Sequence, residues 1–224
     1  MRKMTKRKIP LKHSSLSGYK HSEKSTKKIS YESSLEADFI DVLEWDSRIK
    51  FYEEQPVTIQ YLNENKQLRK YTPDFLVEFH DKPNSDLPIN VPIIYEVKYS
   101  DELIRKMAEF EPKFNAAKAY CKSEGFEFKV ITEIEIRNEY LENIKFLKRF
   151  KRGQIHLPMK DYLKTQLSKF EITTPEILIA SSSQIEEKKA MLLHALWVLI
   201  ANGVISVDLT KKITMNSKIW LPKL

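Results

Sequence analysis

The stretch Tyr71-Thr72-Pro73-Asp74 is followed, after 21 intervening residues, by Glu96-Val97-Lys98. Residues 93–99 are rich in β-branched and aromatic side chains, which predicts a strand. Because side chains alternate along a strand, Glu96 and Lys98 share one face and Val97 points to the other, toward a core. A carboxylate and an ammonium are thus neighbours on one face of this strand.

Asp74 opens a second predicted strand, residues 75–79, and Pro73 suits a strand entrance or a turn. If the two strands pair, Asp74 meets Glu96. Two carboxylates can hold Mg²⁺ against a phosphate, and an ammonium beside them can orient or activate the attacking water. The spacing is that of a metal-dependent nuclease core. The alternative is a surface Pro-Asp turn followed by an ordinary strand with a solvated ion pair, which would have the same sequence pattern.

A predicted amphipathic helix, residues 33–44, lies upstream of these strands. Ser33 or Ser34 can cap its N-terminus, and Glu36 lies beside its apolar stripe. Glu36 is therefore either a third carboxylate of the metal site or the glutamate of a capping box. Gln55 precedes a strand-like run, where it either brings an amide near the site or begins the strand.

The order of these motifs resembles the TnsA family, the endonuclease subunits of heteromeric, two-component transposases of bacterial transposons. The resemblance spans roughly residues 30–150 and implies a restriction-endonuclease-like fold. It rests on Ser33, Glu36 and Phe39, on Gln55-Pro56, on residues 71–77 and 95–98, and on residues 140–150, which resemble the helix that closes the family's nuclease domain.

The resemblance implies a role for each matching residue. Asp74, Glu96 and Glu36 become the catalytic metal ligands, Lys98 the basic catalytic group, and Gln55 a supporting contact. The implied cofactor is Mg²⁺, with two ions per site and Mn²⁺ as a substitute.

Substrate and partners also follow from the resemblance. The family cleaves the 5′ ends of the transposon in double-stranded DNA, while an RNase H-like transposase cuts and joins the 3′ ends and an AAA+ ATPase regulator couples both to target choice. Two alternatives stay open: a non-catalytic assembly module of such a complex, and a stand-alone restriction or repair nuclease of the same superfamily.

Composition excludes several other classes. The chain has no long apolar run that would span a membrane, and its basic N-terminus lacks the hydrophobic stretch of a secretory signal. Its single cysteine, Cys121, rules out an intrachain disulfide framework and fits a core position in a reducing compartment. The expected location is the cytoplasm, in association with the bacterial nucleoid.

Basic residues are concentrated at the N-terminus. Residues 1–28 contain ten Lys and Arg against one acid, Glu23, a net charge of +9, whereas the remainder sums to −2. We therefore predict a flexible basic arm over residues 1–29 that binds the DNA backbone, with a solubilising tail as the alternative. The predicted DNA-binding residues are Arg2, Lys3, Lys6, Arg7, Lys8 and Lys12.

The predicted fold class is α/β, with two domains after the arm. Residues 30–152 form a nuclease domain, in which helices flank a mixed sheet and a hairpin turns at Glu64-Asn65. Residues 80–91 are expected to be a loop. A helix with an apolar stripe from Met107 to Cys121 is expected to kink or divide at Pro112.

The pattern of helices and strands over residues 153–224 predicts a winged-helix-like domain. Helices over 159–169, 175–180 and 186–201 precede two short strands, 204–209 and 218–221. The third helix becomes strongly apolar, which makes it a poor reader of a DNA groove. This favours docking to the regulator ATPase or the transposase, with DNA contact as the second choice.

Overall fold

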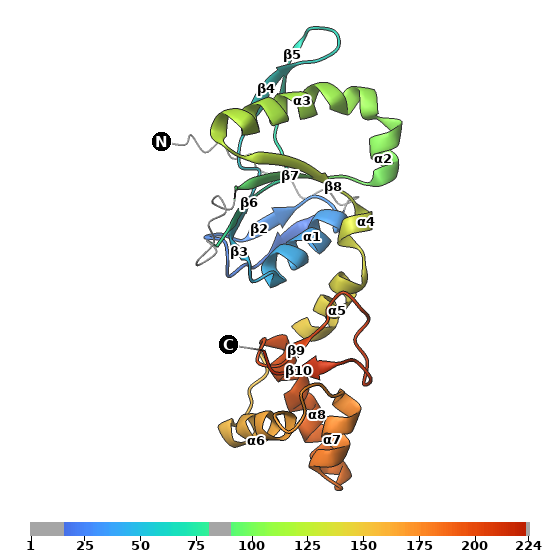
Figure 1. The fold of residues 1–224 in the computed structure, drawn as a ribbon. Helices are drawn as coiled ribbons and strands as arrows, with labels where there is room; N and C mark the ends of the chain where they lie inside the picture. The colour runs from blue at the N-terminus through green and yellow to red at the C-terminus, as the bar shows by residue number, and fades with distance from the viewer. Residues whose placement is uncertain (1–15, 81–90, 223–224) are drawn as a thin grey trace. The chain divides into compact units, whose positions relative to one another are not determined.

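The structure, a computed structural model, describes residues 16–80 and 91–222 (Figure 1). The chain divides between Ile136 and Arg137 into two compact units. The expected loop over residues 80–91 lies almost entirely outside the described residues. None of the helices in the described ranges has the length and apolar character that crossing a bilayer requires.

The first unit contains the expected helices and strands together with four elements that the sequence does not predict, at residues 18–20, 29–31, 49–54 and 133–136. They are β1 (Gly18–Lys20), β2 (Ile29–Tyr31), α1 (Ser34–Trp45), β3 (Ile49–Glu54), β4 (Ile59–Leu62), β5 (Leu68–Tyr71), β6 (Phe75–Phe79), β7 (Ile93–Val97), α2 (Ser100–Arg105), α3 (Met107–Glu124), β8 (Glu127–Ile131) and α4 (Glu133–Ile136). Ser33 caps α1, where its hydroxyl accepts a hydrogen bond from the Glu36 N–H. Gly125, at φ 73°, ends α3 in the left-handed conformation that a glycine adopts without strain.

A four-stranded sheet of order β3-β6-β7-β8 forms the centre of this unit. The β3–β6 and β6–β7 pairs are antiparallel, whereas β7 and β8 are parallel and joined through α2 and α3. The predicted mixed sheet flanked by helices is confirmed, and the architecture is restriction-endonuclease-like.

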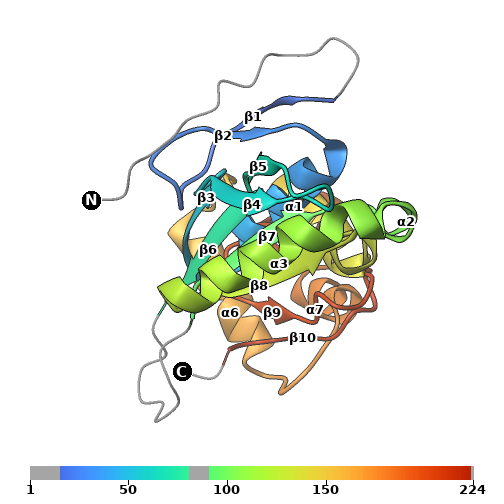
Figure 2. The same cartoon turned by 90° about the horizontal axis from the view of Figure 1, so that it is seen from above.

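The two faces of the sheet are covered by different helices (Figures 1 and 2). On one face, Phe39 of α1 makes edge contacts with the rings of Phe75 and Tyr95. On the other face, Cys121 of α3 packs with Leu76 and Ile94. Because side chains alternate along a strand, Asp74, Glu96 and Lys98 belong to the face that α3 covers.

Two features of the first unit differ from the expectation. The helix after β7 is divided at Lys106, between α2 and α3, and Pro112 lies inside α3. In addition, the last part of the predicted flexible arm forms the β1–β2 hairpin. The Lys20 ammonium there contacts the Ala37 carbonyl and the Asp41 carboxylate, so burial against α1 orders a segment that composition alone marks as flexible.

The second unit consists of four helices and one short antiparallel strand pair. Its elements are α5 (Glu139–Lys148), α6 (Leu157–Leu167), α7 (Pro175–Ser182), α8 (Glu186–Ala201), β9 (Ser206–Val207) and β10 (Ile219–Trp220). Residues 192 and 195–201 of α8 are buried, which agrees with the apolar character of this helix in the sequence. The order of three helices and a strand pair is as predicted, and the winged-helix identity of this unit stays a prediction.

Helix α5, which the sequence analysis placed in the nuclease domain, makes its described contacts within the second unit. The buried side chain of Asn143 donates to the carbonyls of Leu209 and Lys211, both at 2.8 Å, and accepts from the Ile213 N–H at 2.9 Å. Phe146 packs edge-on against Trp197. These long-range contacts explain why the division falls at 136/137 and not at the expected 152/153.

Candidate active site

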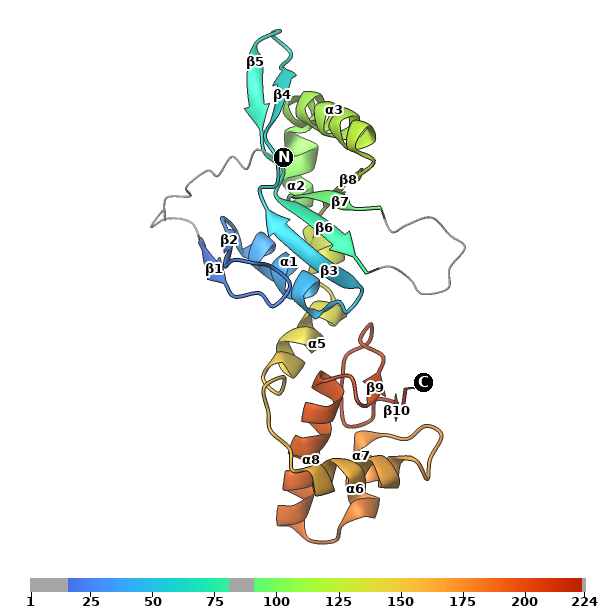
Figure 3. The ribbon, with the colours of Figure 1, turned by 90° about the vertical axis from the view of Figure 1, so that its left-hand side faces the viewer.

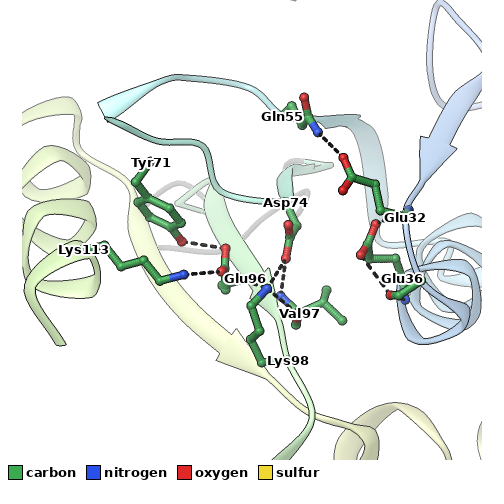
Figure 4. A network of polar contacts seen from close by, with 10 residues as sticks. Glu32, Glu36, Gln55, Tyr71, Asp74, Glu96, Val97, Lys98 and Lys113 are labelled. Atoms are coloured by element: carbon green, nitrogen blue, oxygen red, sulfur yellow. Dashed lines mark hydrogen bonds and ion pairs between the residues drawn. The ribbon is translucent and has the colours of Figure 1, made fainter. Parts of the chain in front are cut away.

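Strands β6 and β7 bring the central motif together (Figure 4). Their register pairs Phe75 with Tyr95, so Asp74 lies across from Glu96 at the end of the pair. The Lys98 ammonium is 3.0 Å from Glu96 Oε1 and 3.6 Å from Asp74 Oδ2. The Val97 N–H donates to Asp74 Oδ2 at 2.7 Å, which fixes the orientation of this carboxylate. The three residues of the motif therefore form one cluster.

Two further residues, neither of them among the predicted site residues, contact Glu96. The Tyr71 hydroxyl donates to Glu96 Oε2 at 2.6 Å, and the Lys113 ammonium lies 3.5 Å from Oε1. Glu96 is 2% exposed, so these donors replace the water that a carboxylate would otherwise bind. The ammonium of Lys113 also lies 4.3 Å from the centroid of the Phe110 ring.

The signal for Lys113 was present in the sequence. Lys113 is three residues after Phe110 and four before Ala117, so it belongs to the apolar stripe of its helix. A lysine in such a stripe indicates a buried anionic partner. Its identity, Glu96, depends on how α3 packs over the sheet, which helical spacing does not reveal.

Burial of this cluster changes the pKa values of its residues. Burial, together with the adjacent Glu96 carboxylate, raises the pKa of Asp74 to about 8. Burial alone would lower the pKa of Lys98, but the carboxylates of Asp74 and Glu96 outweigh it and raise this pKa. Burial and the Glu96 charge raise the pKa of Tyr71, so its hydroxyl keeps the proton that it donates. The metal-free site is thus organised around a protonated Lys98.

Glu36 is held by the cap of α1. Its Oε1 accepts from the Ser33 hydroxyl at 2.9 Å, and its Oε2 accepts from the Glu32 N–H at 2.8 Å. Burial raises the pKa of Glu36, and these two hydrogen bonds oppose that rise. Glu36 nevertheless lines the same cavity as Asp74 and Glu96. The capping contacts are present, and its role as a third metal ligand stays a prediction.

Gln55 supports Asp74 through its backbone. The Gln55 N–H donates to the Asp74 carbonyl at 2.8 Å, while its side-chain amide donates to Glu32 Oε1 at 3.4 Å. Its φ of 48° is uncommon for a residue with a Cβ. The side-chain contact is therefore directed to the α1 side of the cavity.

A cavity of about 590 Å³ contains this cluster. Six acidic and three basic side chains line it: Glu32, Glu36, Glu54, Asp74, Glu96, Glu109, Lys70, Lys98 and Lys113. This excess of negative charge would repel a phosphodiester unless cations offset it.

The carboxylates of Asp74 and Glu96 suit a hard cation such as Mg²⁺, which prefers oxygen ligands. In this structure the Lys98 ammonium lies between these two carboxylates, where a metal ion would bind. In the described ranges, no group of three or more acidic, histidine or cysteine side chains is close enough to enclose a metal ion. The donor set therefore fits Mg²⁺ only if Lys98 moves aside and water, phosphate or Glu36 completes the ligands.

The predicted DNA-binding residues of the arm, Arg2, Lys3, Lys6, Arg7, Lys8 and Lys12, lie outside the described residues.

Residues 46–133 match the family model of the TnsA-like endonuclease N-terminal domain. This match covers β3 to β8 and includes Asp74, Glu96 and Lys98. A search of curated proteins found no match to the chain. The match assigns residues 46–133 to the TnsA-like endonuclease N-terminal domain, and the mixed sheet of the first unit agrees with this assignment.

Proposed function

We propose that this protein is the metal-dependent endonuclease that cleaves the 5′ ends of a transposon during cut-and-paste transposition. The observation that carries the proposal is the convergence of Asp74, Glu96 and Lys98 at 3.0–3.6 Å in one cavity of a TnsA-type domain. The proposed cofactor is Mg²⁺, held by Asp74 and Glu96 with Glu36 as a third ligand. We propose two Mg²⁺ ions per site, the number that the resemblance to the family implies.

The proposed reaction is hydrolysis of a phosphodiester, which leaves a 3′-hydroxyl and a 5′-phosphate without a covalent enzyme intermediate. Bound Mg²⁺ would supply a Lewis acid that polarises the scissile phosphate and lowers the pKa of the attacking water. Lys98 would orient this water and offset the charge that develops on the phosphate. Tyr71 and Lys113 would hold Glu96 in position as Lys98 turns toward the substrate.

The proposed partners are an RNase H-like transposase, which processes the 3′ ends, and an AAA+ ATPase regulator. The TnsA-type domain supports a transposase partner and a DNA substrate in general terms. The second unit is the proposed docking element for these proteins.

The test is cleavage of a duplex with a transposon end by the full chain together with its transposase, in Mg²⁺. Asp74→Ala and Glu96→Gln are expected to abolish cutting of the 5′-ended strand, while the transposase still cuts the other strand. Normal 5′ cleavage by both variants would reject the proposed site. Cleavage without any transposase would favour a stand-alone nuclease.

A further inference from the structure

The β4–β5 hairpin extends beyond the four-stranded sheet (Figures 1 and 3). Residues 59–71 carry three basic side chains, Lys66, Arg69 and Lys70, all exposed, against the single acid Glu64. Residues 29–136 as a whole contain 13 basic and 22 acidic residues, a net charge of −9. The hairpin is thus a positively charged projection within a segment, residues 29–136, that is acidic as a whole.

The hairpin is anchored at its base and closed at its tip. At the base, Ile59 and Tyr71 are buried against Phe110 and Phe114 of α3. At the tip, the Lys66 N–H donates to the Asn63 carbonyl at 2.9 Å, and the Gln67 N–H donates to Asn63 Oδ1 at 2.8 Å. These contacts fix the backbone of the hairpin, and so the positions from which the exposed side chains project.

The hairpin is also directly connected to the candidate active site. Lys70 lines the same cavity as Asp74 and Glu96, and Tyr71 at the end of β5 donates to Glu96. On the other side, Arg69 lines a second hollow of about 530 Å³ with Arg105 and Lys106 of the α2–α3 junction. Basic side chains therefore lead from the catalytic carboxylates to the hairpin tip.

We infer that the β4–β5 hairpin is a DNA-binding arm that positions the duplex over the active site. Lys70 contacts a phosphate next to the scissile one, and Lys66 and Arg69 contact the backbone farther along the duplex. Such contacts fix the register of a protein on DNA without reading its sequence, and a two-stranded ribbon has the size that the major groove admits. The inference rests on the proposed function, because DNA is its partner.

The first experiment measures the salt dependence of duplex binding by fluorescence anisotropy, with the full chain carrying Asp74→Ala to prevent cleavage. The triple variant Lys66→Ala, Arg69→Ala, Lys70→Ala is compared with Lys50→Ala, Lys118→Ala, Lys122→Ala. Both remove three exposed positive charges from the same unit. The hairpin variant is expected to lower the slope of log K against log salt by about 2–3, since each phosphate contact contributes about 0.9. Equal slopes in the two variants would overturn the inference.

The second experiment locates the contact. Because Cys121 is the only cysteine of the chain and is buried, a cysteine at the exposed position 68 can carry a thiol-specific photo-cross-linker. Leu68→Cys is expected to cross-link to the duplex, whereas Lys122→Cys is not. Equal cross-linking at both positions, or none at position 68, would overturn the inference.

The two proposals can fail separately. A chain that cross-links DNA through the hairpin but never cuts it would reject the proposed cleavage and support the DNA-binding arm. A chain that cuts DNA while the hairpin variant keeps the full salt slope would overturn the arm alone. If Leu62→Ser, Leu68→Ser weakened binding to the transposase and the triple variant left DNA affinity unchanged, the hairpin would be a protein contact, which also overturns the inference.

Discussion

The two units of the chain differ in the polar groups that they bury. Among the described residues, both buried charged side chains, Asp41 and Glu96, belong to the first unit, whereas the buried polar side chains of the second unit are the neutral Asn143 and Thr173. Burying a charge is costly unless partners compensate it. Glu96 meets this cost with Tyr71, Lys98 and Lys113, a concentration of polar groups typical of a catalytic site.

Net charge separates residues 29–136 of the first unit from the second unit as well. Residues 29–136 carry −9, whereas residues 137–224, with 15 basic and 8 acidic residues, carry +7. These two charges nearly cancel in the sum of −2 over residues 29–224. The basic excess of the chain therefore lies in the second unit as well as in the N-terminal arm. The acidic segment, residues 29–136, is the one that would need cations to approach a phosphate. Five predictions test the contrast between the two units.

The largest effect is expected from Lys98→Ala. Loss of the ammonium between Asp74 and Glu96 should lower the rate of 5′-strand cleavage by about 10²–10³-fold, the usual effect of removing one group that stabilises charge in the transition state. Single-turnover cleavage measures this rate, with Lys118→Ala as the exposed control. DNA affinity should change little; a variant that cuts normally would remove Lys98 from the site.

Leu196→Ala tests the apolar core of the second unit. Leu196 is 0% exposed, so the cavity should lower the free energy of unfolding by about 2–5 kcal/mol. Calorimetry should show the loss in a transition of the second unit. The matched control is Leu157→Ala, since Leu157 is 71% exposed and should change stability by less than about 0.5 kcal/mol. Equal losses in both variants would contradict the described core.

Asn143→Ala examines a buried side chain of the second unit that makes three hydrogen bonds. It should cost about 1–3 kcal/mol, because two carbonyls and the Ile213 N–H lose their partner. Hydrogen exchange at the Ile213 amide should accelerate in the variant. Unchanged exchange would mean that the loop over residues 209–213 is held by other contacts.

The pH dependence of metal binding tests the charged cluster. In the metal-free protein the pKa of Asp74 is raised from 3.8 to about 8, so the protonated form is favoured on folding. The resulting stabilisation is full below pH 3.8 and is lost as the pH rises to about 8. Metal requires the carboxylate, so the affinity for Mn²⁺ measured by calorimetry should rise from pH 6 to pH 8, by up to about tenfold per pH unit.

Asp74→Ala in the same titration should remove metal binding. A flat affinity from pH 6 to pH 8 in the wild type would show that Asp74 is already ionised in the metal-free protein.

The smallest effect is expected from Arg105→Ala. Arg105 and Asp101 form an exposed i,i+4 pair at 3.0 Å, and such pairs contribute about 0.3–0.5 kcal/mol. Thermal unfolding should be nearly unchanged. A loss of more than about 1 kcal/mol would show that charge on the surface of this unit matters as much as the buried cluster.

Local sequence patterns predicted much of the fold. The alternation around Glu96 predicted β7, the apolar run predicted α8 with the observed bounds, and Glu64-Asn65 marked the turn of the β4–β5 hairpin. These features depend on residues close together in the chain. The convergence of Asp74 with Glu96 was also accessible, because it follows from the pairing of two predicted strands.

Long-range packing accounts for what the sequence did not reveal. Lys113 reaches Glu96 only because α3 covers that face of the sheet, and the β1–β2 hairpin is ordered by contacts of Lys20 with α1. Helix α3 continues through Pro112, because local distortion can accommodate a proline in the interior of a helix. The break lies earlier, at Lys106. Neither the partner of a half-buried lysine nor the site of a helix break follows from residue spacing alone.

If the site binds a divalent cation as proposed, the position of the Lys98 ammonium between Asp74 and Glu96 makes metal binding an exchange of one cation for another. A divalent cation that enters must displace a bound monovalent one, and the displaced ammonium needs a new anionic neighbour. A DNA phosphate in the cavity supplies that neighbour, so metal and DNA should each tighten the binding of the other, by the same factor. With this coupling, the proposed enzyme would bind its metal most tightly when DNA already occupies the cavity.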